Sequence, residues 1–319
     1  MDAKNIQAED AECLERALSH ARNFEPAAQW SSWLIKRLVQ LEKGTIWQPL
    51  LAVAERGVQQ AEQELGGNAP AVAGLLKRQA TLLQQLARYE EAELLFRRAL
   101  AIEEDIYGPD HPNLASSLGN LATLLEEINR LAEAELLMRR ALEIDDASYG
   151  SDHHPDVARD LNNLAQLLKS TNRMAEAEPL MRRALAIDEA SHGIDHPKVA
   201  IGLDILSQVL HEIGLIEEAE QHIKRALTID ESSYGANHPN VAFDLNTFAK
   251  ILKAMGRLSE SDELMRRSLD ILQDFNRSGH ENPKWQRYLQ DYMGILMAQG
   301  LSLADAQSKL RELYQNDCD

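Results

Sequence analysis

The fold is decided by residues 111–150, HPNLASSLGNLATLLEEINRLAEAELLMRRALEIDDASYG, because the chain repeats this stretch. Residues 154–193 read HPDVARDLNNLAQLLKSTNRMAEAEPLMRRALAIDEASHG, and further copies begin at His196-Pro197 and His238-Pro239. Successive His-Pro pairs are 43, 42 and 42 residues apart. A fixed period of about 20–50 residues is the sequence signature of a solenoid, in which similar units stack side by side.

Each copy predicts two helices. Proline after a polar residue favours a helix start, since proline has no N–H to lose in the first turn. Leu118, Leu121 and Leu125 recur three and four residues apart, as on one face of a helix. The pattern breaks at Asn129-Arg130, and a second amphipathic run closes at Tyr149-Gly150, where glycine is typical just past a helix end. We therefore expect a helix, a tight turn, a second helix and a short loop.

Some positions of the repeat hold a small residue in every copy, and positions that hold a bulky residue alternate with them along the helices. This pattern favours close packing of neighbouring helices. One helix pair cannot bury its apolar face alone, but a stack of pairs can. The small positions are Ala122, Ala165, Ser207 and Ala249 in the first helix, with Ala134, Ala177, Ala219 and Ser261 in the second.

This arrangement resembles the tetratricopeptide repeat: Leu-Ala in the first helix, Gly or Asn at the bend, then Ala, a bulky residue and Ala in the second. The usual unit has about 34 residues. The longer unit here, with HPxVAxxLNNLA and RRALxI, is similar to the repeats of kinesin light chain. The resemblance covers about Ala69 to Tyr314. It implies an all-α fold, a right-handed α-solenoid of stacked antiparallel helix hairpins.

The repeats divide the chain into three parts. Residues 1–68 are expected to form an N-terminal capping helix and a degenerate repeat, because a stack needs a cover for its first apolar face. Residues 69–280 are expected to form five regular repeats of about 42 residues. Residues 281–319 are expected to form a divergent C-terminal repeat and a tail.

Composition excludes some classes of partner. The 319 residues contain 51 acidic and 33 basic side chains, for a net charge of −18. Phosphate binding needs a basic surface, so we expect neither a nucleic acid nor an anionic membrane as partner. No apolar run approaches the length of about 18 residues that spans a membrane. Cys13 and Cys318 lie at opposite ends of the chain and no signal peptide is evident, so we expect a cytoplasmic protein.

Residues with reactive side chains recur once per repeat, whereas catalysis needs a unique constellation. The histidines before proline are interpreted as part of the helix start. The acids that end each second helix, beginning with Glu103, Asp145, Asp188 and Asp230, are interpreted as a solvated edge. No nucleotide-binding, hydrolase or metalloprotease motif is present. We therefore expect no enzymatic activity, no cofactor and no metal.

Arginine doublets also recur, as at Arg97-Arg98 and Arg139-Arg140. Each first member follows an acid by four residues, the spacing of an ion pair on a helix. We expect a structural role for these doublets, with an anion-binding ridge as the alternative.

The resemblance implies that the first helices line a concave groove that binds an extended peptide. Asparagine both donates and accepts hydrogen bonds, so it can pair with a peptide backbone, and basic side chains can hold a carboxylate. The set Lys77, Asn120 and Arg159 partly resembles a carboxylate clamp, from which Thr81 and Asn163 depart. The predicted groove residues are Lys77, Arg78, Asn120, Arg159, Asn162, Asn163, Gln166, Lys169, Asn246 and Lys250.

The predicted function is therefore a protein-interaction module for a peptide or protein segment. One alternative is an assembly scaffold that forms a homodimer through its ends or edge, using Trp30, Trp33 and Trp285. Another is a regulatory protein that recruits a partner for chemistry performed elsewhere.

Overall fold

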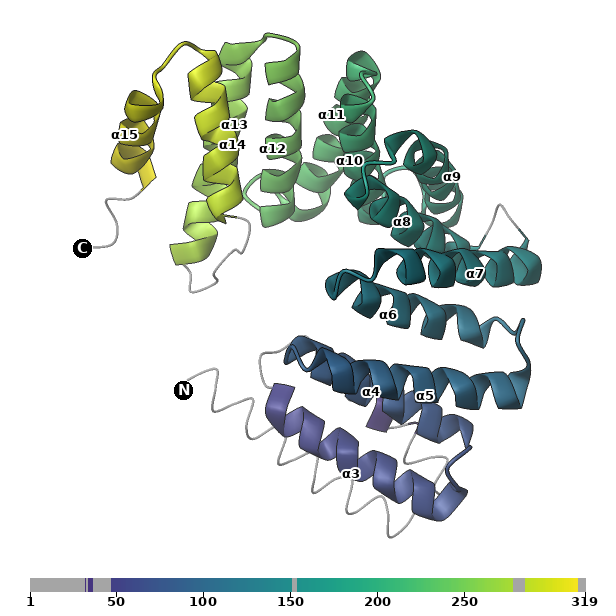
Figure 1. Cartoon of the computed structure of the whole chain (residues 1–319). Helices are drawn as coiled ribbons and strands as arrows, with labels where there is room; N and C mark the ends of the chain where they lie inside the picture. The colour runs from purple at the N-terminus through teal and green to yellow at the C-terminus, as the bar shows by residue number, and fades with distance from the viewer. Residues whose placement is uncertain (1–31, 33, 37–46, 151–153, 278–284, 315–319) are drawn as a thin grey trace. The chain divides into compact units, whose positions relative to one another are not determined.

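The structure, a computed structural model, describes residues 32, 34–36, 47–150, 154–277 and 285–314. The elements in this part of the chain are α-helices joined by short turns, which confirms the predicted all-α class (Figure 1). The helices are α3 (Trp47–Leu65), α4 (Pro70–Gln85), α5 (Tyr89–Tyr107), α6 (Asn113–Glu127), α7 (Leu131–Tyr149), α8 (Pro155–Ser170), α9 (Met174–His192), α10 (Pro197–Glu212), α11 (Ile216–Tyr234), α12 (Pro239–Ala254), α13 (Leu258–Arg277), α14 (Trp285–Ala298) and α15 (Leu303–Tyr314).

The chain divides into two compact units, Met1–Ser151 (unit 1) and Asp152–Asp319 (unit 2). Within each unit every helix packs on the helices before and after it in sequence, as expected of stacked hairpins. The pairs are α4–α5 and α6–α7 in unit 1, and α8–α9, α10–α11, α12–α13 and α14–α15 in unit 2. The predicted capping helix, Cys13, Cys318 and His280 lie outside the described residues.

The bend between the two helices of each repeat has a left-handed backbone. The predicted bends at Asn129 and Asn172 have φ of 61°, and Gly214 and Gly256 have φ of 86° and 74°. Glycine reaches positive φ without strain and asparagine does so more readily than other residues. Ala87, at φ 56°, holds the same position in the first regular repeat, where its Cβ makes this conformation costly.

The repeated histidines are helix caps. In His196, Nδ1 accepts a hydrogen bond from the backbone N–H of Lys198 at 3.2 Å. The Nδ1 atoms of His111, His154 and His238 likewise accept from the backbone N–H two residues later in the chain. This bond satisfies one of the backbone donors that a helix start leaves open. The interpretation of these histidines as part of the helix start is thereby confirmed. The histidine ring also stacks on a residue at the end of the preceding helix: the ring centroids of Tyr107 and His111 are 4.7 Å apart.

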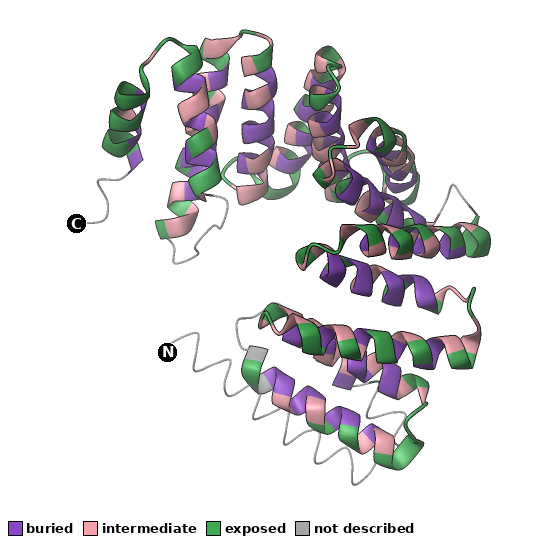
Figure 2. Cartoon of the chain, viewed as in Figure 1, coloured by how far each residue is buried: buried purple, intermediate pink, exposed green. Residues whose placement is uncertain are grey.

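The core follows the small and bulky positions read from the sequence. Ala122, Ala134 and Ala165 are fully buried, and Met138 and Met181 beside them are 3% and 1% exposed. Figure 2 shows the buried residues on the sides of the helices that meet within each unit.

The arginine doublets stabilise this packing. The first member pairs with the acid four residues earlier, as Arg139 does with Glu135 at 2.7 Å, so the structural role is confirmed. The second member reaches the preceding repeat: Arg140 pairs with Glu104 at 2.8 Å and donates to the Pro109 carbonyl at 3.0 Å. The same links between repeats are made by Arg98 to Glu62, Arg225 to Glu189 and Arg267 to Glu231.

Candidate functional site

The first helices lie on the narrower side of unit 2. There α10 contacts α12, and α12 contacts α14, across the repeat boundary. The second helices α9, α11 and α13 show no comparable contact with one another among the described residues. When the first helices of successive repeats lie closer together than the second helices do, the stack of repeats curves toward the side of the first helices. The exposed sides of α10, α12 and α14 therefore form the concave side of unit 2, and Lys169 on α8 joins this side through its hydrogen bond to Gln208 on α10.

A hydrogen-bond network crosses this concave side from α8 to α12. Lys169 Nζ donates to Gln208 Oε1 on α10. Gln208 in turn donates through Nε2 to Asp204 Oδ2 at 2.8 Å and to Thr247 Oγ1 on α12 at 3.5 Å. Burial lowers the pKa of Lys169, and the positive charge of Lys250 acts in the same direction. The predicted groove residue Lys169 is thus held between helices and half buried.

A second cluster joins α12 to α14. Asn246 Nδ2 donates to Asp291 Oδ2 at 3.2 Å, and Lys250 Nζ lies 3.8 Å from the same oxygen. Asn246 is only 3% exposed, so it lies under this surface rather than on it. Lys250 keeps 37% of its side chain exposed.

The amide side chains on α8 differ from these neighbours. Asn162 and Asn163 are half buried and Gln166 is exposed, and none of the three has a hydrogen-bond partner among the residues that the structure describes. The Asn162 Oδ1 atom is fully enclosed. Asn120 on α6 of unit 1 is likewise half buried and has no partner in the described part of the chain. Polar atoms that leave water normally find partners, so the half-buried amides of Asn120, Asn162 and Asn163 keep unused hydrogen-bonding capacity in the described part of the chain.

The predicted cations at the start of the groove are engaged by the protein itself. Arg159 pairs with Asp156 at 2.6 Å and with the buried Asp160 at 3.0 Å. Lys77, in unit 1, pairs with Glu103 at 2.7 Å. Arg78 also has a partner. Arg159 and Lys77 neutralise acids of their own unit, so any contact with a ligand would compete with that role.

The acids that end the second helices correct the sequence interpretation of a solvated edge. Glu103, Asp145, Asp188 and Asp230 are between 1% and 8% exposed. A signal for this burial was present, because Glu103 follows the packed Ala99 by four residues and therefore shares its face of the helix. Their neighbours in sequence, such as Glu104, do remain accessible.

One junction in unit 2 holds two buried acids. Asp230 on α11 and Asp244 on α12 are each 3% exposed, and Asp230 Oδ1 and Asp244 Oδ2 lack hydrogen-bond partners in the described part of the chain. Burial raises the pKa of Asp230 to about 6 and the pKa of Asp244 to about 9, with the charge of Asp204 adding to both shifts. Asp244 is therefore protonated at neutral pH. No set of three or more His, Cys, Asp or Glu side chains in the described ranges is arranged to hold a metal ion.

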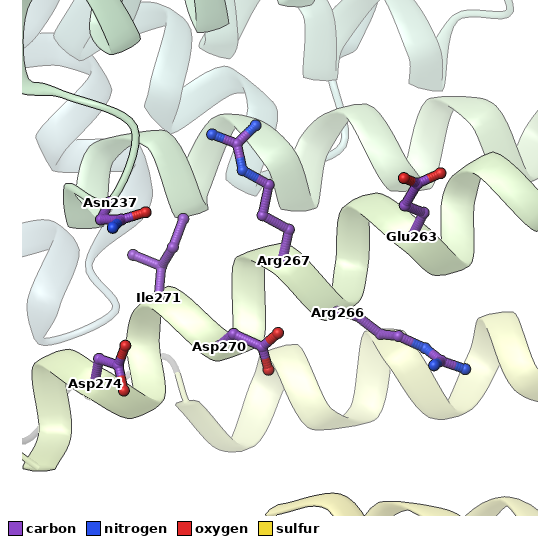
Figure 3. A pocket seen from close by; sticks show the side chains of 7 residues that line it. All are labelled: Asn237, Glu263, Arg266, Arg267, Asp270, Ile271 and Asp274. Atoms are coloured by element: carbon purple, nitrogen blue, oxygen red, sulfur yellow. The ribbon is translucent and has the colours of Figure 1, made fainter.

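A pocket of about 310 Å³ lies along α13 (Figure 3). Its charged side chains do not converge: Arg266 and Arg267 point in different directions, and Asp274 and Glu263 lie at opposite ends of the view. Arg266 donates to the Tyr292 hydroxyl at 2.8 Å, and Arg267 is paired as described above. The arrangement lacks a shared point at which a reacting atom could be held. No helix in the described part of the chain is long and apolar enough to cross a membrane.

Comparisons with known proteins agree with this architecture. The model of the tetratricopeptide repeat family matches residues 72–147, 156–232 and 203–274, together more than half of the chain. BtubC (BKLC) from P. vanneervenii is similar in structure, with a TM-score of 0.63 and 23% identity over 75% of this chain and 96% of the other. A putative kinesin light chain of Podosopora anserina with nearly identical repeats gives a TM-score of 0.58 and 22% identity over 66% and 99%. No curated protein matches the chain.

Proposed function

This chain belongs to the tetratricopeptide repeat family, and on that premise we propose that it binds an extended segment of another protein on the concave side of unit 2. The observation that carries the proposal is the set of unpartnered amides on α8, Asn162, Asn163 and Gln166. An amide offers a donor and an acceptor together, which is what the backbone of an extended peptide requires.

The neighbouring helices support an extended ligand. Ile201 on α10 is 53% exposed, and Ile205 beside it is half buried, so an apolar strip continues from the α8 amides. Because the network of Lys169 and Gln208 fixes α8, α10 and α12 relative to one another, the surface is organised before a ligand arrives. A peptide would then bear most of the ordering cost.

The test uses peptides selected from a random dodecapeptide phage library on the full chain, with affinities measured by calorimetry. Asn163→Ala combined with Gln166→Ala should weaken binding by about tenfold or more, which corresponds to about 1.4 kcal/mol. The melting temperature should stay within a few degrees, since neither amide has a partner in the described part of the fold. Gln221→Ala, an exposed amide on the outer side of α11, is the matched control and should leave affinity unchanged.

Equal affinities for the double variant and the control would overturn the proposal, as would a loss of affinity that tracks a loss of stability. Selection of no binding peptide at all would do the same. We also place the protein in the cytoplasm as part of this proposal, which rests on its having only two, widely separated cysteines.

Self-association through the ends of the chain receives less support. Trp30 and Trp33 lie outside the described residues. Trp285 packs edge-on against Tyr314, with 5.9 Å between ring centroids, and contributes to the C-terminal core.

A further inference from the structure

Two leucines stand out on the second helices of unit 1. Leu94 on α5 is 68% exposed and Leu136 on α7 is 67% exposed, more than any other large apolar residue in the described part of the chain. They occupy the same position of consecutive repeats, 42 residues apart. Single exposed leucines are common on protein surfaces, but a pair at equivalent positions forms the start of an apolar patch.

Ion pairs show that the two leucines share one surface. Arg97 on α5 pairs with Glu133 on α7 at 2.5 Å, and Arg130 pairs with Glu93 at 2.7 Å. Glu93 directly precedes Leu94, and Glu133 lies one turn before Leu136. These bridges hold the outer faces of α5 and α7 together, and Figure 2 shows both faces exposed. We call this surface, formed by residues 88–101 and 130–143, the outer leucine face.

The outer leucine face has no net charge, although the chain as a whole carries −18. Residues 88–98 contain three arginines and three glutamates, and residues 130–143 contain three of each as well. Two copies of a chain with this charge repel each other over most of their surfaces. On this face the repulsion is absent, and each copy presents both signs of charge to the other. A patch that is neutral, apolar at its centre and of mixed charge around it fits a second copy of itself.

The equivalent positions in unit 2 do not continue the feature. Pro179, Gln221 and Glu263 stand there in α9, α11 and α13. The packing of the repeats therefore does not require leucine at this position, and a structural role common to all repeats does not explain Leu94 and Leu136.

We propose that the outer leucine face is the docking surface for a second copy of this chain, in a two-fold symmetric dimer with Leu94 and Leu136 at the centre of the interface. Such an interface pairs the same patch from both chains. This interface is built from the second helices of unit 1, whereas the proposed peptide site is built from the first helices of unit 2. The dimer would present two peptide-binding surfaces.

The test measures the mass of the full chain by sedimentation and light scattering between about 1 and 200 µM, a range that covers micromolar dissociation constants. Wild type should shift from monomer to dimer within this range. Leu94→Glu with Leu136→Glu should remain monomeric, because charge would replace the apolar centre. Leu94→Ala with Leu136→Ala should weaken dimerisation by about tenfold. The matched control Gln221→Glu adds a charge at the equivalent position of unit 2 and should dimerise like wild type.

Both leucines are exposed, so the variants should melt like wild type, and circular dichroism checks this. A wild type that stays monomeric throughout the range overturns the proposal, as does a double glutamate variant that still dimerises, which would place the contact elsewhere. Recruitment of an unrelated protein by a monomeric wild type through this face also overturns it. Peptide affinity should be unaffected by the leucine variants, so failure here is distinguishable from failure of the proposed function.

Discussion

The two units treat the same buried position in different ways. In unit 1 Glu103, 5% exposed, pairs with Lys77 and accepts a hydrogen bond from the Ser117 hydroxyl of the next helix. In unit 2 Asp230 holds the place of Glu103 and Asp244 holds the place of Ser117. Unit 1 therefore buries a charge with a cation and a donor, whereas unit 2 buries two acids.

This difference shows that the repeat specifies a buried acid but not its partner. A buried charge needs an opposite charge and hydrogen bonds, or it takes up a proton instead. Glu103 in unit 1 shows the first solution and Asp244 in unit 2 shows the second, as the raised pKa of Asp244 indicates. Exchanging the partners between units is the direct way to test this account.

Removing the cation in unit 1 should have the largest effect. Lys77→Met leaves Glu103 buried without its ion pair, and we expect a loss of about 3 kcal/mol in the stability of unit 1. Hydrogen exchange read by mass spectrometry should localise the loss to α4, α5 and α6. Lys224→Met, at a lysine that is 53% exposed, is the control and should cost less than about 0.5 kcal/mol. Equal effects of the two changes would contradict the account of Glu103.

Replacing the Asp244 carboxyl of unit 2 by a hydroxyl donor, as at Ser117 in unit 1, should stabilise unit 2. Asp244→Ser replaces one of the two buried acids by serine, the residue that stands at the equivalent position 117 in unit 1. The hydroxyl of the new side chain can donate a hydrogen bond to Asp230. We expect a gain of about 1–3 kcal/mol at pH 8, measured by chemical unfolding. Asp274→Ser, at an acid whose side chain is 80% exposed, is the control and should change stability by less than about 0.5 kcal/mol. A destabilised Asp244→Ser variant would show that the carboxyl group has partners worth more than its burial costs.

The same pair predicts a pH dependence with a definite sign. Asp244 has a pKa of about 9 when folded and about 3.9 when unfolded. Between these values the folded chain binds a proton that the unfolded chain has released, so stability falls as pH rises. The contribution is fully present below about pH 4 and is lost as pH approaches 9. Unfolding curves from pH 5 to 9 should show this slope in wild type and a smaller slope in Asp244→Ser; parallel curves would contradict the assignment.

The residues at the bends between helices also differ between the units, and we expect a smaller effect on stability from this difference. Unit 1 has Ala87 at φ 56° where unit 2 has Gly214 and Gly256. Ala87→Gly should relieve strain and stabilise unit 1 by about 1 kcal/mol, since a left-handed residue with a Cβ costs about that much. Asn129→Gly, at an asparagine in the same conformation, should change stability by only a few tenths of a kcal/mol. Thermal unfolding distinguishes the two, and a destabilised Ala87→Gly would be inconsistent with strain at the bend.

The surface ion pairs should have the smallest effect. Arg130 bridges Glu93 and Glu133, but its side chain is 44% exposed. Arg130→Ala should therefore cost less than about 1 kcal/mol, and less still at high salt. Chemical unfolding at low and high salt measures this, and a loss as large as that of Lys77→Met would mean that exposed pairs matter as much as buried ones.

The sequence by itself determined the local structure. The 42-residue period, the amphipathic runs and the Asn and Gly bends predicted the helix pairs that the structure shows. This succeeded because helix starts, bends and apolar faces depend on residues within one or two turns of each other. The resemblance to the tetratricopeptide repeat could be recognised from the sequence because it also depends on these local patterns.

Only the tertiary structure decided which polar groups are committed and which are available. Arg140 and Glu104, or Lys77 and Glu103, meet across helices, so no local pattern shows that they pair. The same contacts leave Asn163 without a partner in the described part of the chain. Burial and pairing are properties of neighbouring repeats together, and the candidate site depends on them rather than on residue type alone.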